Sequence, residues 1–330
     1  MVKALVNRAS APDGGVRSTR KRDSGIGGKK NTNMSAKLRT AIYLPNYGPF
    51  GDARVVADLA RDAESAGWDG FFLWDHIATY NEDGGSFPHT DPWLALTVAA
   101  MQTTTIKLGT TVTPLPRRRP HKLARETVTL DRLSNGRLIL GVGIGLGKRE
   151  WDHLGEETAL QSRGRMLDEG LEILAGLWSG EPFQYNGEHY HIDQAQFLPP
   201  PFQQPRIPVW VGGEWPNKRP FLRMARWDGM FPLFSVWGPE QEPVYAEAVS
   251  FVKTERKRLG LNGHFDVIKM GMSPGDDPDE ATTRINSAAK AGATWWLELL
   301  MPEVYDLSPT DPKAFTVLQT RVMQGPPGAS

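Results

Sequence analysis

A regular alternation of short apolar β-type runs with helical patterns is the feature that most constrains how this chain can fold. From residue 38 onward the same unit repeats, and each β-type run is separated from the next by a segment with helical spacing. Such alternation is typical of parallel strands joined by crossover helices. Eight strands of this kind predict an α/β fold, a (β/α)8 TIM barrel, and a doubly wound open sheet is the main alternative. The expected strands are Thr40–Leu44, Gly70–Trp74, Ile106–Val112, Arg137–Val142, Ile207–Val211, Gly229–Leu233, Val267–Met270 and Thr294–Leu300.

The segment between the fourth and fifth expected strands is too long for a simple βα unit. Residues 149–206 therefore predict an insertion beside a helix, whose apolar face runs from Met166 to Trp178 at 3.6-residue spacing. Its end, Leu198-Pro199-Pro200-Pro201-Phe202, indicates an irregular connector. We expect one barrel domain over residues 34–330 that contains this insertion.

Residues 1–33 differ from the rest of the chain, because they combine a surplus of Lys and Arg with very few apolar side chains. Such a segment cannot offset the entropy of ordering, so a disordered basic tail is expected. It lacks the apolar core of a secretory signal, and Met34 is a candidate for an alternative start of translation. A nucleic-acid-binding arm is the alternative interpretation, but we expect no nucleic-acid partner.

The chain contains no cysteine, which excludes disulfides, thiolate nucleophiles and cysteine-ligated metal sites. A cytoplasmic location fits this composition. The longest stretch without charge, residues 92–106, is shorter than the ~20 apolar residues of a membrane span, so no membrane partner is expected. His189 and His191 lack further ligands at a recognisable spacing; we predict a partly exposed hairpin there and no metal site.

Catalytic groups of a barrel lie in the loops that follow the strands. Asp75 and His76 follow the second expected strand, and histidine is the natural proton carrier near neutral pH. We predict that this pair is catalytic, although a histidine that is merely hydrogen-bonded within its loop is an equal alternative. Glu298, the acidic residue within an expected strand, is an unpromising catalyst for a lyase or isomerase.

Glycines and basic residues follow other strands. The fourth strand leads into Gly143 and Gly145, where a ligand can approach the backbone closely, although the spacing fits neither a phosphate loop nor a dinucleotide fingerprint. The fifth strand runs into Gly212-Gly213, whose amides are candidates for a phosphate nest. The run Arg117-Arg118-Arg119 is either a contact for an anionic cofactor tail or, more commonly, solvated loop charge.

Four segments in this order resemble the luciferase-like monooxygenase superfamily over about residues 38–300. They are Ala66-Gly67-Trp68-Asp69-Gly70-Phe71-Phe72-Leu73-Trp74-Asp75-His76, Leu108-Gly109-Thr110-Thr111-Val112-Thr113-Pro114, Leu133-Ser134-Asn135-Gly136-Arg137 with Gly141-Val142-Gly143-Ile144-Gly145, and Pro208-Val209-Trp210-Val211-Gly212-Gly213. The resemblance implies a flavin-like ring across the barrel mouth, backed by a bulge in the third strand.

The resemblance also assigns cofactor contacts to individual residues. It implies a non-prolyl cis peptide at Thr111–Val112 and places Thr111, Val112 and Thr113 behind the ring. Gly143 and Gly145 approach the ring or its linker, and Gly212 and Gly213 bind the phosphate. Asp75 holds the cofactor or the imidazole of His76.

The Asp75-His76 pair is similar to that of family members that use the deazaflavin coenzyme F420. This implies an oxidoreductase that transfers hydride to or from a small organic substrate, with a reduced-FMN-dependent monooxygenase as the alternative and a non-catalytic flavin-binding barrel as the second. A separate flavin or deazaflavin reductase and a homodimer are further expectations. Leu146 stands where related sugar-phosphate dehydrogenases carry a catalytic glutamate, so we expect a less polar substrate. Candidate contacts for it are Trp74, Trp93, Trp215, Phe234 and Trp237.

Overall fold

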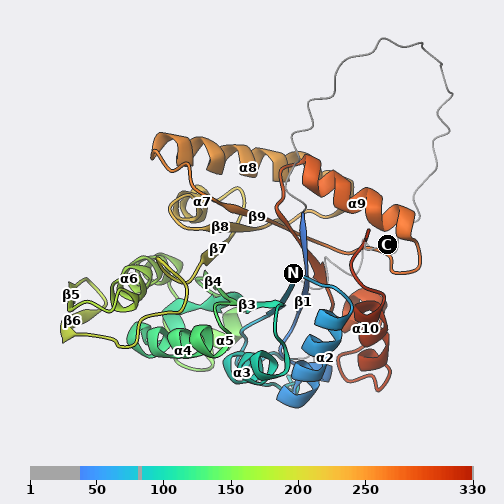
Figure 1. Cartoon of the computed structure of the whole chain (residues 1–330), viewed down its shortest axis with the longest axis horizontal. Coiled ribbons are helices and arrows are strands. Elements are labelled where there is room, and N and C mark those ends of the chain that lie inside the picture. Colours follow the sequence, from blue (N-terminus) through green and yellow to red (C-terminus); the bar gives the residue numbers. More distant parts are fainter. Residues whose placement is uncertain (1–37, 81–83, 329–330) are drawn as a thin grey trace, which may run out of the picture.

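The computed structural model describes residues 38–80 and 84–328, so the tail predicted at residues 1–33 lies outside the described residues. Eight parallel strands close into a barrel, in the order β1-β10-β9-β8-β7-β4-β3-β2 around the ring. Each lies where the alternation predicted a strand, so the (β/α)8 prediction is confirmed (Figure 1). The strands are β1 (Arg39–Leu44), β2 (Gly70–Leu73), β3 (Lys107–Pro114), β4 (Leu138–Gly143), β7 (Val209–Glu214), β8 (Gly229–Leu233), β9 (Asp266–Gly271) and β10 (Trp295–Leu299).

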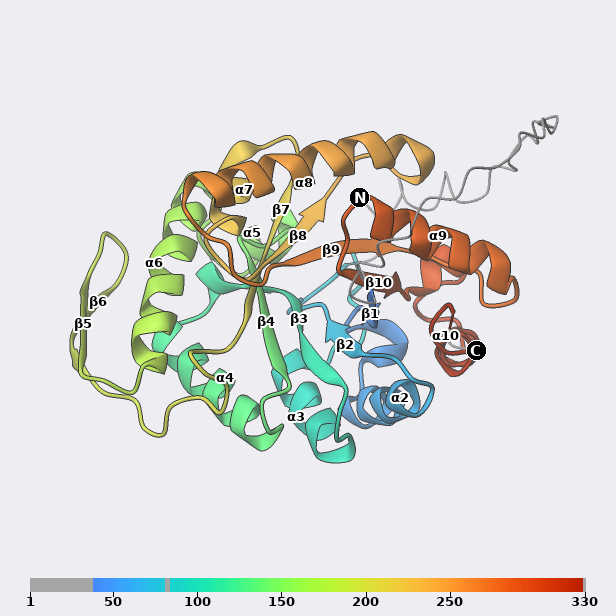
Figure 2. The same cartoon turned by 45° about the horizontal axis from the view of Figure 1, so that its top comes forward.

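Helices surround the barrel, and their apolar faces pack onto the outer side of the strands (Figure 2). Val56, Leu59, Ala60 and Ala63 are buried in α2, the first of them. No described helix is both long and apolar enough to cross a lipid bilayer. The helices are α2 (Ala53–Ser65), α3 (Pro92–Gln102), α4 (Pro120–Leu133), α5 (Lys148–Asp152), α6 (Leu160–Trp178), α7 (Lys218–Met224), α8 (Gln241–Arg258), α9 (Pro278–Lys290) and α10 (Ala314–Met323).

Aromatic rings fill the interior of the barrel. The rings of Phe72 and Trp210 lie 4.9 Å apart, and Trp295 contacts both at 5.9 and 5.3 Å. All three side chains are fully buried. Since these rings occupy the inside of the barrel, a ligand has access to the strands only at their ends, which is where barrel enzymes bind substrates.

The third strand is irregular at its carboxyl end. Its pairing with β4 shifts register between Thr110 and Thr113, and the peptide bond between Thr111 and Val112 is cis. The bulge and the non-prolyl cis bond predicted from the family resemblance are therefore confirmed. The strand also continues to Pro114, beyond the predicted end at Val112.

The predicted insertion between the fourth and fifth barrel strands is present. It contains α5, then α6, which packs beside α4, and then an antiparallel hairpin of β5 (Phe183–Asn186) and β6 (His191–Ala195). In Figure 2 the hairpin lies outside α6, away from the barrel. The connector that follows contains cis peptide bonds before Pro199 and Pro205. The part added to the barrel is therefore the hairpin with its connector, because α6 takes the place of an ordinary barrel helix.

Candidate active site

The carboxyl ends of the barrel strands carry mainly apolar side chains on the inner face. Tyr43 on β1 contacts the ring of Trp74 at 5.6 Å and that of Phe231 at 5.6 Å. Burial raises the pKa of Tyr43, so its hydroxyl stays neutral. The mouth therefore offers aromatic and thioether surface to a ligand. Further side chains packed against this inner layer are Val112, Leu233, Trp237, Met270, Met272 and Val304.

Val112 stands between two glycines of neighbouring strands. A Cβ atom on Gly143 would lie 2.8 Å from Val112 Cγ2, and a Cβ atom on Gly212 would lie 2.9 Å from Val112 Cγ1. Both distances are shorter than a van der Waals contact, so side chains at these two positions would displace Val112. Glycine at both positions therefore leaves room for Val112.

Two polar atoms near the bulge have no partner. Thr111 is 2% exposed, and its Oγ1 makes no hydrogen bond with any described residue; the same is true of Trp74 Nε1. Buried polar atoms without partners are unusual in folded proteins. They are available to a bound ligand. Thr113 is different, because its hydroxyl donates to Asp75 at 2.8 Å and lies 2.9 Å from the hydroxyl oxygen of Thr110.

Asp75 lies in a buried network. Its side chain is 1% exposed, and Oδ2 accepts hydrogen bonds from Thr113 at 2.8 Å, from Arg118 at 2.8 Å and from Trp93 Nε1 at 3.3 Å. Arg117 approaches Oδ1 at 3.5 Å and donates to the backbone oxygen of Asp75 at 2.9 Å. The Asp75 carboxylate is therefore fully occupied by hydrogen bonds that hold its own loop in place.

The imidazole of His76 is held by Glu150, a residue that the sequence analysis missed. Its Nδ1 lies 3.0 Å from Oε2 of Glu150. The other carboxylate oxygen accepts the backbone N–H of Ile77 and that of Ala78, the latter at 3.3 Å. The interpretation that Asp75 holds the imidazole is thus wrong, because its carboxylate is occupied by Arg118 and Thr113.

The basic run after β3 supplies the counter-charges of this site. Arg117 pairs with Glu150 at 2.9 Å as well as with Asp75, and its side chain is 2% exposed. The side chain of Arg118, 19% exposed, pairs with Asp75 at 2.8 Å. Solvated loop charge is therefore the wrong interpretation for these two arginines. Arg119 is exposed, as that interpretation expected.

Asn46, in the loop after β1, fixes the backbone of His76. Its Oδ1 accepts the His76 N–H at 3.1 Å, and its Nδ2 donates to the carbonyls of His76 and Thr90 at 2.8 Å each. His89 lies in the same region, and its Nε2 is 3.0 Å from Oγ1 of Thr79. Burial lowers the pKa of His89, so His89 is neutral at neutral pH.

The glycines after β4 and in β7 lie in different surroundings. Gly145 has φ +81°, a conformation that favours glycine, and a Cβ atom there would lie 2.4 Å from the ring of Trp151. Gly212 and Gly213 were expected in a loop nest after the fifth strand, but they are within β7 and pair with β8. A Cβ atom on Gly213 would meet Pro220 of α7 at 2.3 Å, so this position faces the helix layer.

The aromatic residues expected around the substrate divide into two groups. Trp74 and Trp237 pack against the inner layer of the barrel. Trp215 and Phe234 belong instead to the core between strands and helices, where Trp215 contacts Phe221 at 4.8 Å. Trp93 also belongs to that core and donates to Asp75. The prediction that Trp93, Trp215 and Phe234 line the mouth is therefore wrong.

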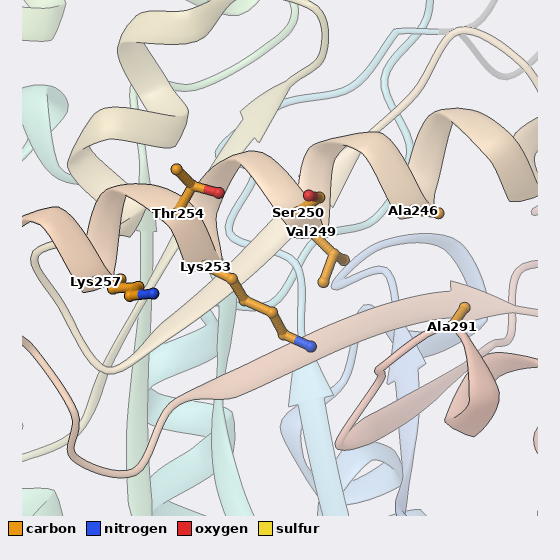
Figure 3. Close-up of a pocket in the computed structure, with 7 residues that line it drawn as sticks. All are labelled: Ala246, Val249, Ser250, Lys253, Thr254, Lys257 and Ala291. Atoms are coloured by element: carbon orange, nitrogen blue, oxygen red, sulfur yellow. The ribbon is translucent and has the colours of Figure 1, made fainter.

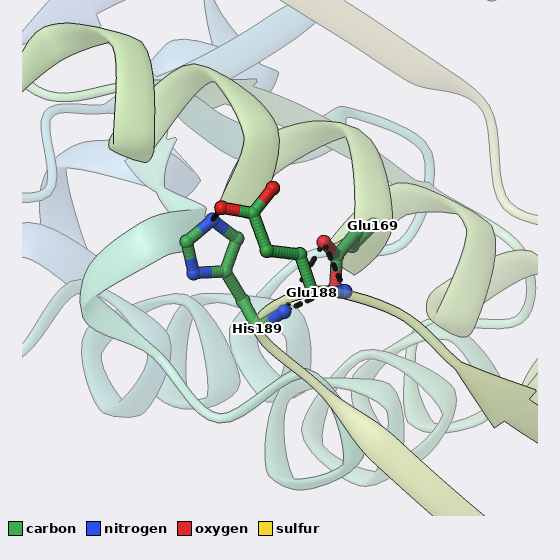
Figure 4. A group of neighbouring side chains, drawn as sticks. All are labelled: Glu169, Glu188 and His189. Carbon is green, nitrogen blue, oxygen red and sulfur yellow. Dashed lines mark hydrogen bonds and ion pairs between the residues drawn. The ribbon is translucent and has the colours of Figure 1, made fainter.

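A group of possible metal ligands lies where α6 meets the turn of the hairpin, and not at the mouth. Glu169, Glu188 and His189 bring their ligand atoms together there (Figure 4). Glu169, however, already accepts the backbone N–H groups of Glu188, His189 and Tyr190 at 3.0 to 3.2 Å. Its carboxylate closes the turn of the hairpin, which accounts for the cluster without an ion.

A surface depression lies along α8 and extends to Ala291 (Figure 3). Lys253, Thr254 and Lys257 line it together with Ser250, and all four are exposed. It contains none of the groups that follow the barrel strands. The mouth around Val112 and His76 is therefore the better candidate for chemistry.

Comparison with known proteins identifies the family of this chain. A sequence model of the family described as luciferase-like monooxygenase matches residues 34–300. The F420-dependent glucose-6-phosphate dehydrogenase of Nakamurella multipartita is 34% identical over 181 residues, which cover 53% of this chain and 50% of that protein. The oxygenase component of the flavin-dependent trigonelline monooxygenase of Acinetobacter baylyi is 33% identical over 131 residues, 40% of this chain and 36% of that protein. The chain thus spans about half the length, or less, of these curated relatives.

Solved structures agree on the fold. The coenzyme F420-dependent tetrahydromethanopterin reductase of Methanopyrus kandleri superposes with a TM-score of 0.64 at 18% identity, over 88% of this chain and 99% of that chain. At this level of identity the likeness concerns the barrel alone.

Proposed function

Because the chain belongs to the luciferase-like monooxygenase family, we propose that it is an oxidoreductase that moves hydride between coenzyme F420 and a small organic substrate. The observation that carries the proposal is the arrangement at the mouth: a partly exposed histidine, fixed by a buried carboxylate, beside a glycine-flanked bulge. Relatives along about half of the chain are F420-dependent dehydrogenases, which supports the choice of coenzyme.

The residues present fit a flat tricyclic ring. Gly143 and Gly212 keep the sides of Val112 free of other side chains, and the buried Oγ1 of Thr111 lacks a partner. We propose that Thr111, Val112 and Thr113 back the ring, with Thr113 acting through Asp75. Gly143 and Gly145 approach it. A deazaflavin bound there would supply a carbon that accepts or donates hydride.

His76 is proposed as the catalytic acid or base. When hydride leaves or reaches a carbon that bears oxygen, a proton must leave or reach that oxygen, and histidine transfers protons near neutral pH. The imidazole is 22% exposed, and its ring lies 5.7 Å from that of Trp74 at the mouth. Asp75 is proposed as a positioning residue, since its carboxylate holds Arg118 and Thr113 and is shielded from the mouth.

The lining of the mouth favours a substrate with a large apolar part. Its inner-layer side chains are aromatic, aliphatic or thioether, and Leu146 is 49% exposed on the loop after β4. We therefore propose a substrate less polar than the sugar phosphate named for the relatives.

A reduced-FMN-dependent monooxygenase is the second candidate, favoured by the similarity to the trigonelline monooxygenase component. That name designates an oxygenase component, which supports a separate reductase as partner here. The same site would serve, with the aromatic residues at the mouth excluding water. A non-catalytic flavin-binding barrel is the third candidate and does not require His76.

Equilibrium binding distinguishes these candidates. The purified chain is titrated with coenzyme F420, with oxidised FMN and, under anaerobic conditions, with reduced FMN. Tight F420 binding and weak FMN binding support hydride transfer. Preference for reduced FMN supports oxygen activation, and binding without turnover of any tested carbonyl or alcohol substrate supports the non-catalytic barrel.

A homodimer in the cytoplasm completes the proposal. The exposed face of α3 carries Leu94, Val98 and Met101, with 67%, 37% and 68% exposure, at helical spacing. An apolar stripe of this kind suits a contact with a second copy. Light scattering coupled to gel filtration tests it: a dimer that becomes a monomer in the Leu94→Glu variant supports the proposal, and a wild-type monomer contradicts it.

A further inference from the structure

We infer that Glu150 is a positioning residue that fixes the tautomer and orientation of His76, so that Nε2 is the atom available for proton transfer. The inference rests on the proposed role of His76 but concerns a residue in the insertion, 74 positions along the chain. In this arrangement Nε2 transfers the proton, and Glu150 holds the ring in place.

The carboxylate of Glu150 is itself held rigidly. It is 4% exposed and receives the N–H of Ile77 and of Ala78 on Oε1, where Arg117 also approaches at 2.9 Å. Only Oε2 is left for the imidazole, at 3.0 Å. A carboxylate bound on one oxygen by the loop and on the other by the ring leaves the imidazole little freedom to rotate.

The charge of Glu150 determines which ring nitrogen carries the proton. Burial favours the neutral acid, but the hydrogen bond and charge of His76, together with the charge of Arg117, outweigh it and hold the pKa of Glu150 below its ordinary value. An ionised carboxylate accepts hydrogen bonds and donates none. Nδ1 must therefore be the protonated nitrogen of the neutral ring, and Nε2 has its lone pair free.

No other described group competes for this role. Asn46 contacts only the backbone of His76, and Trp74 meets the ring edge to face. The charged or titratable groups around the imidazole are Glu150, Arg117, Asp75 and His89. Of the two carboxylates, Asp75 is engaged by Arg118. Among the described residues none hydrogen-bonds to Nε2, which is therefore left for a ligand.

Nitrogen-15 NMR of histidine-labelled protein tests the inference without knowledge of the substrate. The chain has 7 histidines, and the signal lost in His76→Gln assigns the one of interest. Wild-type protein is expected to show the Nδ1–H tautomer. In Glu150→Gln the side-chain amide can donate a hydrogen bond as well as accept one, so it no longer enforces this tautomer, and the Nε2–H form is expected to appear in the His76 signal.

Glu247→Gln removes the same charge from an exposed position on α8 and should leave the His76 signal unchanged. An Nε2–H tautomer in the wild-type protein overturns the inference, even if Glu150→Gln does not fold. An unchanged tautomer in Glu150→Gln also overturns it.

A double-mutant cycle on turnover separates this inference from the proposed function. If Glu150 acts through His76, Glu150→Gln slows turnover about 10-fold or more in the wild-type background and has no further effect in His76→Gln. Equal slowing in both backgrounds overturns the inference alone. Undiminished turnover in His76→Gln overturns the proposed role of His76.

Discussion

The barrel buries two glutamates in clusters with similar partners, one at the mouth and one between the strands and the helices. Glu150 is bound by Arg117, His76 and two backbone N–H groups. Glu298 on β10 is fully buried, accepts hydrogen bonds from Ser273 and Trp296, and lies 3.5 Å from Arg321.

The two clusters differ in their access to the outside. The cluster of Glu150 includes an imidazole that is 22% exposed, whereas the side chains of Glu298 and Arg321 are 0% and 5% exposed. Burial and the partners also act differently on the acids: burial raises the pKa of Glu298, while the partners of Glu150 overcome burial and lower its pKa. A buried charge therefore does not by itself indicate catalysis. What indicates it is a proton carrier that connects the buried charge with the mouth.

The largest effect is expected at His76, the exposed member of the Glu150 cluster. His76→Gln should lower turnover about 100- to 10,000-fold, the usual contribution of a general acid or base, with little change in coenzyme affinity. Steady-state kinetics on the coenzyme and substrate pair found by screening measures it. His191→Gln, at an exposed position on the hairpin, is the control. Turnover above one tenth of wild type in His76→Gln would contradict the view that the cluster of Glu150 is catalytic and that of Glu298 is not.

A substitution in the buried cluster of Glu298 should lower the free energy of unfolding and leave function unchanged. Arg321→Met leaves Glu298 without its cation and is expected to cost about 3–5 kcal/mol in the free energy of unfolding, because the remaining charge is buried. Urea unfolding measures this value, and coenzyme affinity should stay as in wild type. Arg258→Met breaks only an exposed pair with Glu255 and should cost ~1 kcal/mol or less. Equal costs in the two variants would contradict the comparison.

A smaller effect is expected at Gly143, beside Val112 in the proposed ring site. Gly143→Ala places a methyl group against Val112 and should weaken coenzyme binding, with a loss of stability of about 1–3 kcal/mol. Val112→Ala in the same chain should restore part of both. Gly263→Ala adds a methyl group in open space and serves as the control. Binding titrations that show no difference between the two glycine variants would exclude Gly143 from the site.

The pH dependence of stability should separate the two acids by sign. Glu150 has a lowered pKa when folded, so its contribution is present above the ordinary value of 4.5 and is lost as the pH falls through the folded pKa. Glu298 has a raised pKa when folded, so its ionisation costs stability as the pH rises from 4.5 through the folded pKa. Urea unfolding between pH 3 and 7 gives the stability difference between wild type and Glu150→Gln, and between wild type and Glu298→Gln. The first difference should rise with pH below about 5 and the second should fall as the pH rises above 4.5. Slopes of the same sign would refute the distinction.

The fold was predictable because each of its elements has a local signal. Strand residues such as Phe72 and Trp210 occur in short apolar runs, and α2 repeats its apolar face every 3.6 residues. The bulge at Thr111–Val112 was predictable only through the family resemblance, since no periodicity marks a break in register.

The site was predictable only in part. Asp75 and His76 were found because they follow a strand directly, and the glycines because of their density. Glu150 was missed, since its partner lies 74 residues away and no spacing rule links an acid in an insertion with a histidine after the second strand. Trp215 and Phe234 were placed wrongly, because a residue just past a strand can turn toward the helices as readily as toward the mouth.

The closure of the barrel has a consequence for how copies of this chain meet in concentrated solution. Each barrel strand has a neighbour on both sides, so within the described part of the chain the free strand edges belong to the hairpin of β5 and β6. Free edges are where β-rich proteins aggregate. The outward positions of the hairpin are polar and exposed, among them Gln184, Asn186, His191 and Asp193. Resistance to edge-to-edge assembly is therefore concentrated in these few side chains, and apolar replacements there should promote fibril formation without disturbing the barrel.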